Sequence, residues 1–190
     1  MIVIPASNAV YIALPHTAST SLREWLIRFH GGIKEGEDHS SYIPVSYHDA
    51  LFFTVMRDPY DRAAGLWKKL ARKPDREAHE NYWKSAGIPF AKSLTDYCEM
   101  LVEGSFPPAR RFVFWNQSKH LNGMKPRVLR FDKMPDALLE LPFVDDVSTF
   151  PHRNRNGADK SDYPVVWTDR ARDAVRTWAK EDFALLGGGS

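Results

Sequence analysis

Apolar residues along the chain form short continuous runs that alternate with stretches of helical spacing. Two runs, residues 9–14 and 51–56, are continuous, too short for a helix, and end at Pro15 and at Arg57. Runs of this kind, without polar alternation, are typical of strands that are covered on both faces in a parallel sheet. We therefore predict buried strands at these two places, and a third strand over residues 127–131.

Each of the first two runs leads into an amphipathic helix. The apolar positions of the first helix recur at i, i+3, i+4 and i+7, at Leu22, Trp25, Leu26 and Phe29. Ser21 and Glu24 have the spacing of a capping box at its start. After the second run, Asp58 and Pro59 predict an N-cap and a first-turn proline.

The rest of the chain continues the alternation. Helices are predicted over residues 94–102, after Pro135, and over 169–186, with a loop over 145–164. Repeated strand–helix units favour an α/β fold of three layers, α/β/α, with a central parallel sheet, and ligands of such folds bind at the carboxyl ends of the strands. We expect one domain, residues 1–186, and interpret residues 187–190, GGGS, as the remnant of a linker or tag.

Composition narrows the classes of partner. The 26 basic and 24 acidic residues leave a formal charge of +2, which argues against a nucleic-acid partner, so any anion site must be local. No segment approaches the roughly 20 apolar residues of a membrane span and no signal peptide is visible, so we expect a cytoplasmic chain without a membrane partner. The single cysteine, Cys98, excludes an internal disulfide and is predicted to be a buried thiol.

Two polar segments follow the first two predicted strands, where ligands of this fold class bind. The first, PHTASTS, offers hydroxyls and backbone N–H groups at the positive end of a helix dipole, although it lacks the glycines and the lysine of a Walker loop. Its residues are Pro15, His16, Thr17, Ala18, Ser19, Thr20 and Ser21. The second begins with Arg57, whose guanidinium could bind another phosphate through two hydrogen bonds. Together they predict a site for a nucleotide with phosphates at two places.

A plainer interpretation accounts for the same residues. The hydroxyls of the loop would only cap the following helix, and Arg57 would pair with Asp58 or Asp61. Taken alone, these two segments leave both interpretations open.

The same segments resemble the signature of a known enzyme family. LPHTASTSL followed by FFTVMRDPYDR is similar to the motifs of sulfotransferases that use 3′-phosphoadenosine 5′-phosphosulfate (PAPS), especially those that act on carbohydrates. The TAST run is similar to that of the uronosyl 2-O-sulfotransferases. QSKHLNG, PRVLRFDKM, PHRNRNG and KEDFALL then follow in the order that the family shows, so the resemblance touches most of the chain.

The resemblance implies a P-loop-NTPase-like sulfotransferase fold, with transfer of a sulfonate group from PAPS to an acceptor hydroxyl of a glycan or small molecule and no metal. The loop of residues 15–21 would hold the 5′-phosphosulfate, and Arg57 the 3′-phosphate. Two positions depart from the family. His16 stands in place of a lysine, and it either acts as a protonated or N–H donor or is only a solvated loop residue. Gly65 replaces a serine that shares the 3′-phosphate, a loss that Arg153 or Arg155 could offset.

Attack of the acceptor oxygen on sulfur needs a base on one side of the reacting group. The family often supplies it between the first helix and the second strand, where this chain has His39 and His48. We predict His39 as the base and His48 as the second candidate. A carboxylate such as Glu37 or Asp38 is the alternative, in which case the histidines are exposed loop residues.

The acceptor site is the least readable part of the sequence. Some aromatic residues could stack on a sugar, although core packing explains them equally well: Trp67, Tyr82, Trp83, Phe90, Phe106 and Trp115. A basic run would favour an acidic glycan if it lined the cleft, and otherwise forms a solvated helix face: Lys68, Lys69, Arg72, Lys73 and Arg76. Two rival functions remain, a P-loop kinase or other nucleotide-binding protein, and a sulfotransferase-like module without catalysis. The oligomeric state is left open.

Overall fold

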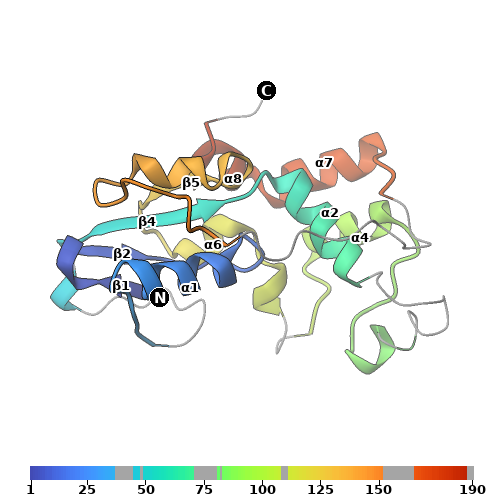
Figure 1. Cartoon of the computed structure of the whole chain (residues 1–190). Helices are drawn as coiled ribbons and strands as arrows, with labels where there is room; N and C mark the ends of the chain where they lie inside the picture. The colour runs from blue at the N-terminus through green and yellow to red at the C-terminus, as the bar shows by residue number, and fades with distance from the viewer. Residues whose placement is uncertain are drawn as a thin grey trace.

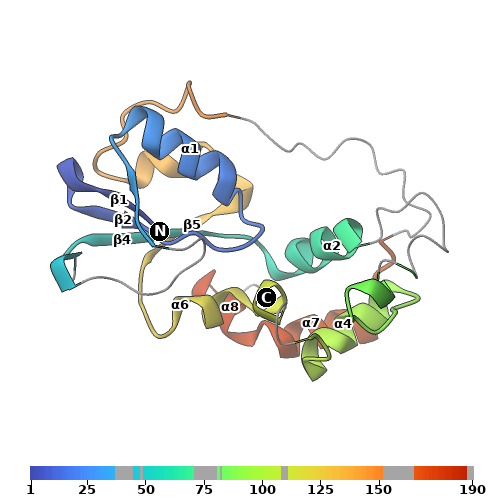
Figure 2. The same ribbon diagram turned by 90° about the horizontal axis from the view of Figure 1, so that it is seen from below.

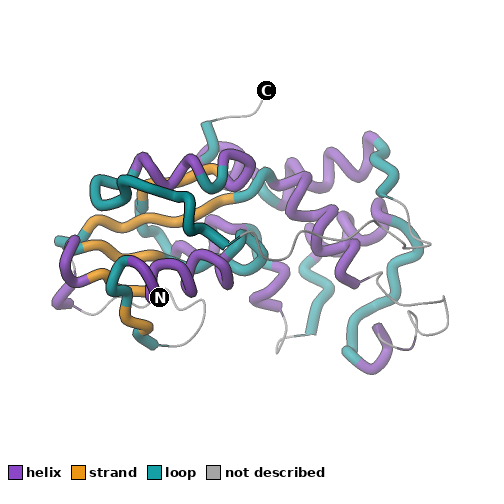
Figure 3. Tube along the Cα trace, in the orientation of Figure 1, coloured by secondary structure: helices purple, strands orange, loops and turns teal. Residues whose placement is uncertain are grey.

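A mixed sheet forms the centre of the molecule. The computed structural model describes residues 1–36, 45–47, 49–70, 81, 83–107, 111–151 and 165–187. Within them, five strands lie in the order β3-β1-β2-β4-β5 (Figures 1 and 3). They are β1 (Ile2–Ile4), β2 (Ala9–Tyr11), β3 (Ile33–Lys34), β4 (Leu51–Met56) and β5 (Arg127–Arg130). The adjacent strands β2, β4 and β5 are parallel, and β1 runs opposite to both of its neighbours.

Helices cover both faces of this sheet and also form a group beside it (Figure 2). α1 (Ser19–Phe29) lies on one face, and α6 (Gln117–Leu121) and α8 (Lys180–Leu185) lie on the other. α2 (Pro59–Leu70), α4 (Leu94–Glu103) and α7 (Asp169–Trp178) pack together beyond the end of β4 (Figure 1). In the described part of the chain, 3₁₀ turns are formed by Pro5–Ser7, Val45–Tyr47, Phe112–Phe114, Phe131–Lys133 and Asp136–Glu140. Each helix within the described ranges is too short or too polar to span a bilayer.

Side chains of alternate strand residues point to the two opposite faces of the sheet. Tyr11 and Phe53 pack with Trp25 on the α1 side, and the ring centroids of Tyr11 and Phe53 lie 5.4 Å apart. Ile12 and Met56 belong to the core on the α6 side. Because both faces are covered, strand residues of either parity are mostly apolar, which confirms buried strands at both predicted places. The second has the predicted bounds, 51–56, whereas the first covers only residues 9–11 of the predicted 9–14.

The helical group has its own aromatic core. Trp67, Trp83 and Phe106 are 1%, 0% and 3% exposed, so core packing is the correct interpretation for these three aromatic residues. Phe90 packs against the same core from a half-buried position, and Tyr82 lies outside the described residues. Cys98 is 0% exposed, which confirms that its thiol is buried.

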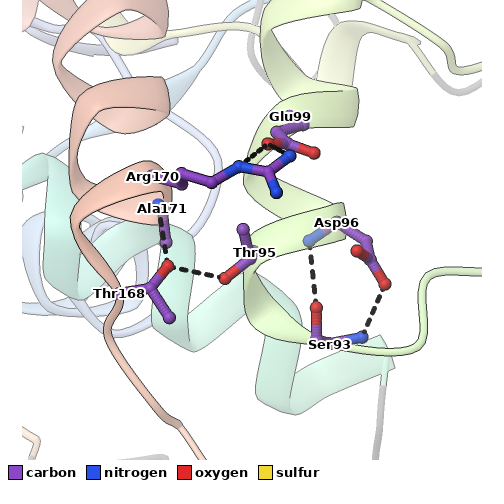
Figure 4. Close-up of polar contacts among 7 residues, drawn as sticks. All are labelled: Ser93, Thr95, Asp96, Glu99, Thr168, Arg170 and Ala171. Carbon is purple, nitrogen blue, oxygen red and sulfur yellow. Dashed lines mark hydrogen bonds and ion pairs between the residues drawn. The ribbon is translucent and has the colours of Figure 1, made fainter.

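Two helix caps join the starts of α4 and α7 (Figure 4). The Ser93 hydroxyl accepts a hydrogen bond from the Asp96 N–H at 3.1 Å, and the Asp96 carboxylate accepts one from the Ser93 N–H, also at 3.1 Å. The Thr168 hydroxyl accepts from the Ala171 N–H at 3.1 Å and lies 2.8 Å from the Thr95 hydroxyl. The two caps therefore satisfy orphan N–H groups and also connect the helices to each other.

Several sequence predictions need correction. The capping box at Ser21 is wrong, because α1 begins at Ser19 and its N-cap is Ala18, which forms no side-chain cap. The helix after Pro135 is a 3₁₀ turn, and the long closing helix is two helices that break at Ala179. The strands β1 and β3 were not predicted, and β1 makes the sheet mixed where a purely parallel one was expected.

Candidate functional site

Three strand ends meet at one edge of the sheet, because β2, β4 and β5 are adjacent and parallel. Beyond β2 the chain reaches the loop of residues 15–18, beyond β4 it reaches Arg57, and beyond β5 it reaches Phe131. The first two are the segments that the sequence singled out. The topology therefore brings both predicted anion-binding elements to the same edge.

The loop before α1 has an unusual backbone. His16 and Ala18 have φ values of 65° and 59°, left-handed conformations that residues other than glycine rarely adopt. Thr17 between them is not in this region, so the sign of φ alternates along the loop. Alternation of this kind turns successive N–H groups toward one side and forms the concave anion sites known as nests. Strained backbone of this type concentrates at functional sites.

Backbone donors at the start of α1 are available to a ligand. The N–H groups of Ser19, Thr20 and Ser21 make no hydrogen bond within the described residues, as expected for the first turn of a helix without a side-chain cap. The Thr17 hydroxyl, which is fully buried, donates to the Leu14 carbonyl at 3.0 Å and braces the loop. Hydroxyl capping of α1, which the plainer interpretation required, is therefore not what the loop provides.

The guanidinium of Arg57 is half-buried and incompletely bonded. Its Nε is buried without a hydrogen-bond partner among the described residues, and its Cζ lies 4.9 Å from the centroid of the Phe131 ring. Burial lowers the pKa of Arg57, and the carboxylates of Asp61 and Asp58 partly oppose that change. The side chain nevertheless remains a cation at any ordinary pH.

The carboxylates beside Arg57 serve other purposes. Asp58 Oδ1 accepts hydrogen bonds from the Tyr60 N–H at 2.9 Å and from the Asp61 N–H at 3.1 Å, which confirms it as the N-cap of α2. Within the described ranges, neither Asp58 nor Asp61 forms an ion pair with Arg57. The pairing that the plainer interpretation assumed is absent there, so Arg57 keeps donors for a ligand.

Gly65 has a steric role toward Arg57. A Cβ atom at this position would lie 3.0 Å from Arg57 Nη1, which is closer than ordinary van der Waals contact. The glycine therefore lets the guanidinium lie against the backbone of α2. The glycine and the resting position of Arg57 are linked, because a side chain at residue 65 would require the guanidinium to shift by a few tenths of an ångström.

Other residues at this edge were not predicted from the sequence. The side-chain amide of Gln117 is hydrogen-bonded to the backbone of Arg57, and Asp182 in α8 accepts hydrogen bonds from Gln117. At the end of β5, Arg130 forms a two-bond pair with Asp132 at 3.1 and 3.2 Å, which raises the pKa of Arg130 and lowers that of Asp132. The sequence segments that contain these residues were quoted only for the family resemblance, and no feature of the sequence indicated that the residues contact one another.

A cavity of about 280 Å³ lies away from the strand ends, between the end of α4 and the start of α6. Trp115 lines it from a half-buried position, and Lys119 Nζ lies 4.7 Å from the centroid of the Trp115 ring. Of the six aromatic residues considered as sugar contacts, Trp115 is thus one that does not belong to the hydrophobic core.

The remaining predicted residues lie outside the described residues: His39, His48, Glu37, Asp38, Arg153 and Arg155. In the basic run, Lys68 is half-buried and Lys69 is exposed, whereas Arg72, Lys73 and Arg76 are also outside the described residues. Across the described ranges, no group of three or more histidine, cysteine or acidic residues is placed to hold a metal ion.

Comparisons of the chain with known protein families, with curated proteins and with solved structures find no match. What the strand ends bind is therefore inferred from their geometry and from the chemistry of the residues.

Proposed function

We propose that the chain is a PAPS-dependent sulfotransferase with a P-loop-NTPase-like sulfotransferase fold, which transfers a sulfonate group to the hydroxyl of a carbohydrate acceptor. The observation that carries the proposal is the meeting of two features at one sheet edge. The first is a loop with alternating φ that leads into the unbonded N–H groups of the first turn of α1, and the second is an arginine whose Nε lacks a partner among the described residues. Two separate anion-binding elements suit a nucleotide with phosphates at two places. The order of the sequence motifs supports the same donor.

In the proposed reaction, a sulfur–oxygen bond to the acceptor forms while the bond from sulfur to the bridging oxygen breaks, and adenosine 3′,5′-bisphosphate leaves. The N–H groups at the start of α1 stabilise the charge that grows on the departing phosphate, and His16 donates to the bridging oxygen. Arg57 holds the 3′-phosphate. We assign removal of the acceptor proton to His39, ahead of His48 or a carboxylate such as Glu37 or Asp38.

Nucleotide binding without metal tests the donor site. By calorimetry in the presence of a chelator, we expect adenosine 3′,5′-bisphosphate to bind more tightly than adenosine 5′-phosphate. Arg57→Ala should lower the affinity for the bisphosphate by about 10- to 100-fold, because hydrogen bonds to a charged group are lost. The affinity for the monophosphate should stay nearly unchanged. Arg170→Ala, which removes an exposed arginine of α7, is the matched control and should bind like the parent chain.

Other outcomes favour the rival functions. Tighter binding of ATP with magnesium than of the bisphosphate would indicate a P-loop kinase and contradict the proposal. Release of adenosine 3′,5′-bisphosphate from PAPS, followed with a panel of sugar acceptors, separates an enzyme from a module without catalysis. In that assay His39→Ala should lower the transfer rate by ~10² or more with donor affinity retained, and an unaltered rate would remove His39 as the base.

A further inference from the structure

We propose that Gln117 is a positioning residue of the donor site. Its side-chain amide fixes the backbone of Arg57, and thereby the direction from which the guanidinium reaches the 3′-phosphate, while Asp182 fixes the amide itself. This inference rests on the proposed function and adds to it two residues that never touch the nucleotide.

The backbone of Arg57 lies at a gap between two regular elements. The last residue pair of the β4–β5 ladder is Met56 with Arg130, and α2 begins at Pro59. Gln117 supplies the partners that a neighbouring strand would otherwise give. The Arg57 N–H donates to Gln117 Oε1 at 2.8 Å, and Gln117 Nε2 donates to the Arg57 carbonyl at 2.8 Å. Both backbone groups of Arg57 are thus satisfied by one side chain.

The orientation of the Gln117 amide follows from its partners. A backbone carbonyl and a carboxylate only accept hydrogen bonds, so the NH₂ group must face the Arg57 carbonyl and Asp182, and the oxygen must face the Arg57 N–H. Gln117 Nε2 lies 3.2 Å from Asp182 Oδ2, and the Gln117 N–H donates to the same oxygen at 2.8 Å. Gln117 and Asp182 are both 0% exposed, so water does not replace these bonds.

Asp182 is itself held from several sides. Its second oxygen accepts from the Ser118 N–H at 2.7 Å, so the carboxylate also caps the start of α6. Its charge faces the buried guanidinium of Arg62, which is 1% exposed and stacks 5.3 Å above the Trp178 ring. Burial lowers the pKa of Arg62 to about 10, and the attraction of Asp182 opposes that change. Because these contacts fix the Asp182 carboxylate, it can in turn fix the orientation of the Gln117 amide.

The arrangement matters for ligand choice because the guanidinium already has restricted space. Gly65 limits it on one side and the Phe131 ring on another. A phosphate that is bound by two parallel hydrogen bonds requires the planar group to be aligned as well as near. If the Arg57 backbone loses its two bonds to Gln117, the guanidinium samples more orientations. The affinity for the bisphosphate should then fall more than the affinity for the monophosphate, which has no 3′-phosphate.

The test compares two affinities within each variant. Calorimetry gives the ratio of the dissociation constant of adenosine 5′-phosphate to that of adenosine 3′,5′-bisphosphate for the parent chain, Gln117→Met, Asp182→Asn and the control Ser93→Ala. Methionine has nearly the size of glutamine and forms no equivalent bonds. We expect the ratio to fall about tenfold in Gln117→Met, which corresponds to the loss of one charged hydrogen bond to the phosphate, and to fall less in Asp182→Asn. Ser93→Ala removes a cap remote from Arg57 and should keep the parent ratio.

Each outcome decides between the claims. A folded Gln117→Met chain with the parent ratio overturns the inference and leaves the proposed function intact. A parent chain with a ratio near one overturns the proposed function, and the inference falls with it. If Gln117→Met does not fold, Asp182→Asn decides by the same ratio, with the parent value again contradicting the inference. Equal weakening of both nucleotides would show a merely structural role and also overturn it.

Discussion

At the scale of single residues, His16 and Ala18 hold conformations that cost free energy on folding. A left-handed backbone costs an L-residue other than glycine roughly 1–2 kcal/mol, and the two φ values are 65° and 59°. Glycine would adopt the same shape without a steric penalty. The loop keeps side chains there instead, and the fully buried Thr17, bonded to Leu14, helps to enforce the shape from within.

Replacement of Ala18 tests whether strain is stored in the loop. Ala18→Gly is expected to raise the free energy of unfolding by up to about 1 kcal/mol, because relief of the steric cost exceeds the added entropy of the unfolded chain. Urea denaturation measures the change. Ala174→Gly, inside α7, is the matched control and should lower the free energy of unfolding by about 1 kcal/mol. A similar loss in Ala18→Gly would mean that the loop is unstrained.

Residue types predicted only part of the site. Arg57 was predictable because a charge that directly follows a buried apolar strand must emerge at the sheet edge. Gln117 was not, because it lies 60 residues from Arg57 in sequence and its role depends on tertiary contact. Gly65 looked like a missing hydroxyl, and its closeness to Arg57 Nη1 appears only in three dimensions. Local pattern thus predicts which charged and polar groups lie at the strand ends but not the residues that support them.

At the scale of elements, length decided what the pattern could predict. The six-residue strand β4 was predicted with its observed bounds, and the Asp58 cap marked the start of α2. β1 and β3 have three and two residues, too few for a period to be recognised. The break at Ala179 has no glycine or proline to mark it, and the helix that follows, α8, packs on α6.

The α4–α7 contact offers a test of caps against surface charge (Figure 4). Ser93→Ala should lower the free energy of unfolding by about 1 kcal/mol, because the Asp96 N–H loses its acceptor. Glu99→Gln should cost less than about 0.5 kcal/mol, since its partner Arg170 has a side chain that is 77% exposed. Chemical denaturation of both variants checks this order. The reverse order would assign the stability of the contact to the ion pair.

At the scale of the whole molecule, the apolar interior is divided between the sheet and the helical group beside it. The sheet has cores on both faces, and the helical group packs around its aromatic side chains. Cys98 lies in the helical core and is 0% exposed, so its thiol reports on the integrity of that half of the molecule.

Burial raises the pKa of the Cys98 thiol from 9.0 to about 12. The thiolate fraction at pH 8 should therefore be about 10³-fold smaller in the folded chain, and shielding of the sulfur slows reaction further. A chromogenic disulfide reagent, added with and without denaturant, measures both rates, and Cys98→Ser should abolish the signal. Folded and unfolded rates within tenfold of each other would mean that α4 opens readily.

The bend at Ala179 divides the C-terminal segment into two helices that pack against different parts of the molecule. α7 packs on α4 in the helical group, and α8 carries Asp182 to the residues behind Arg57. A ligand that restrains the guanidinium end of the sheet also restrains α8, and linkage requires that the effect work in both directions. Substitutions in α8 that move Asp182 should then weaken the proposed anion binding, whereas loss of the exposed Glu99–Arg170 pair between α4 and α7 should not. A helix on the far side of the sheet would in this sense belong to the ligand site.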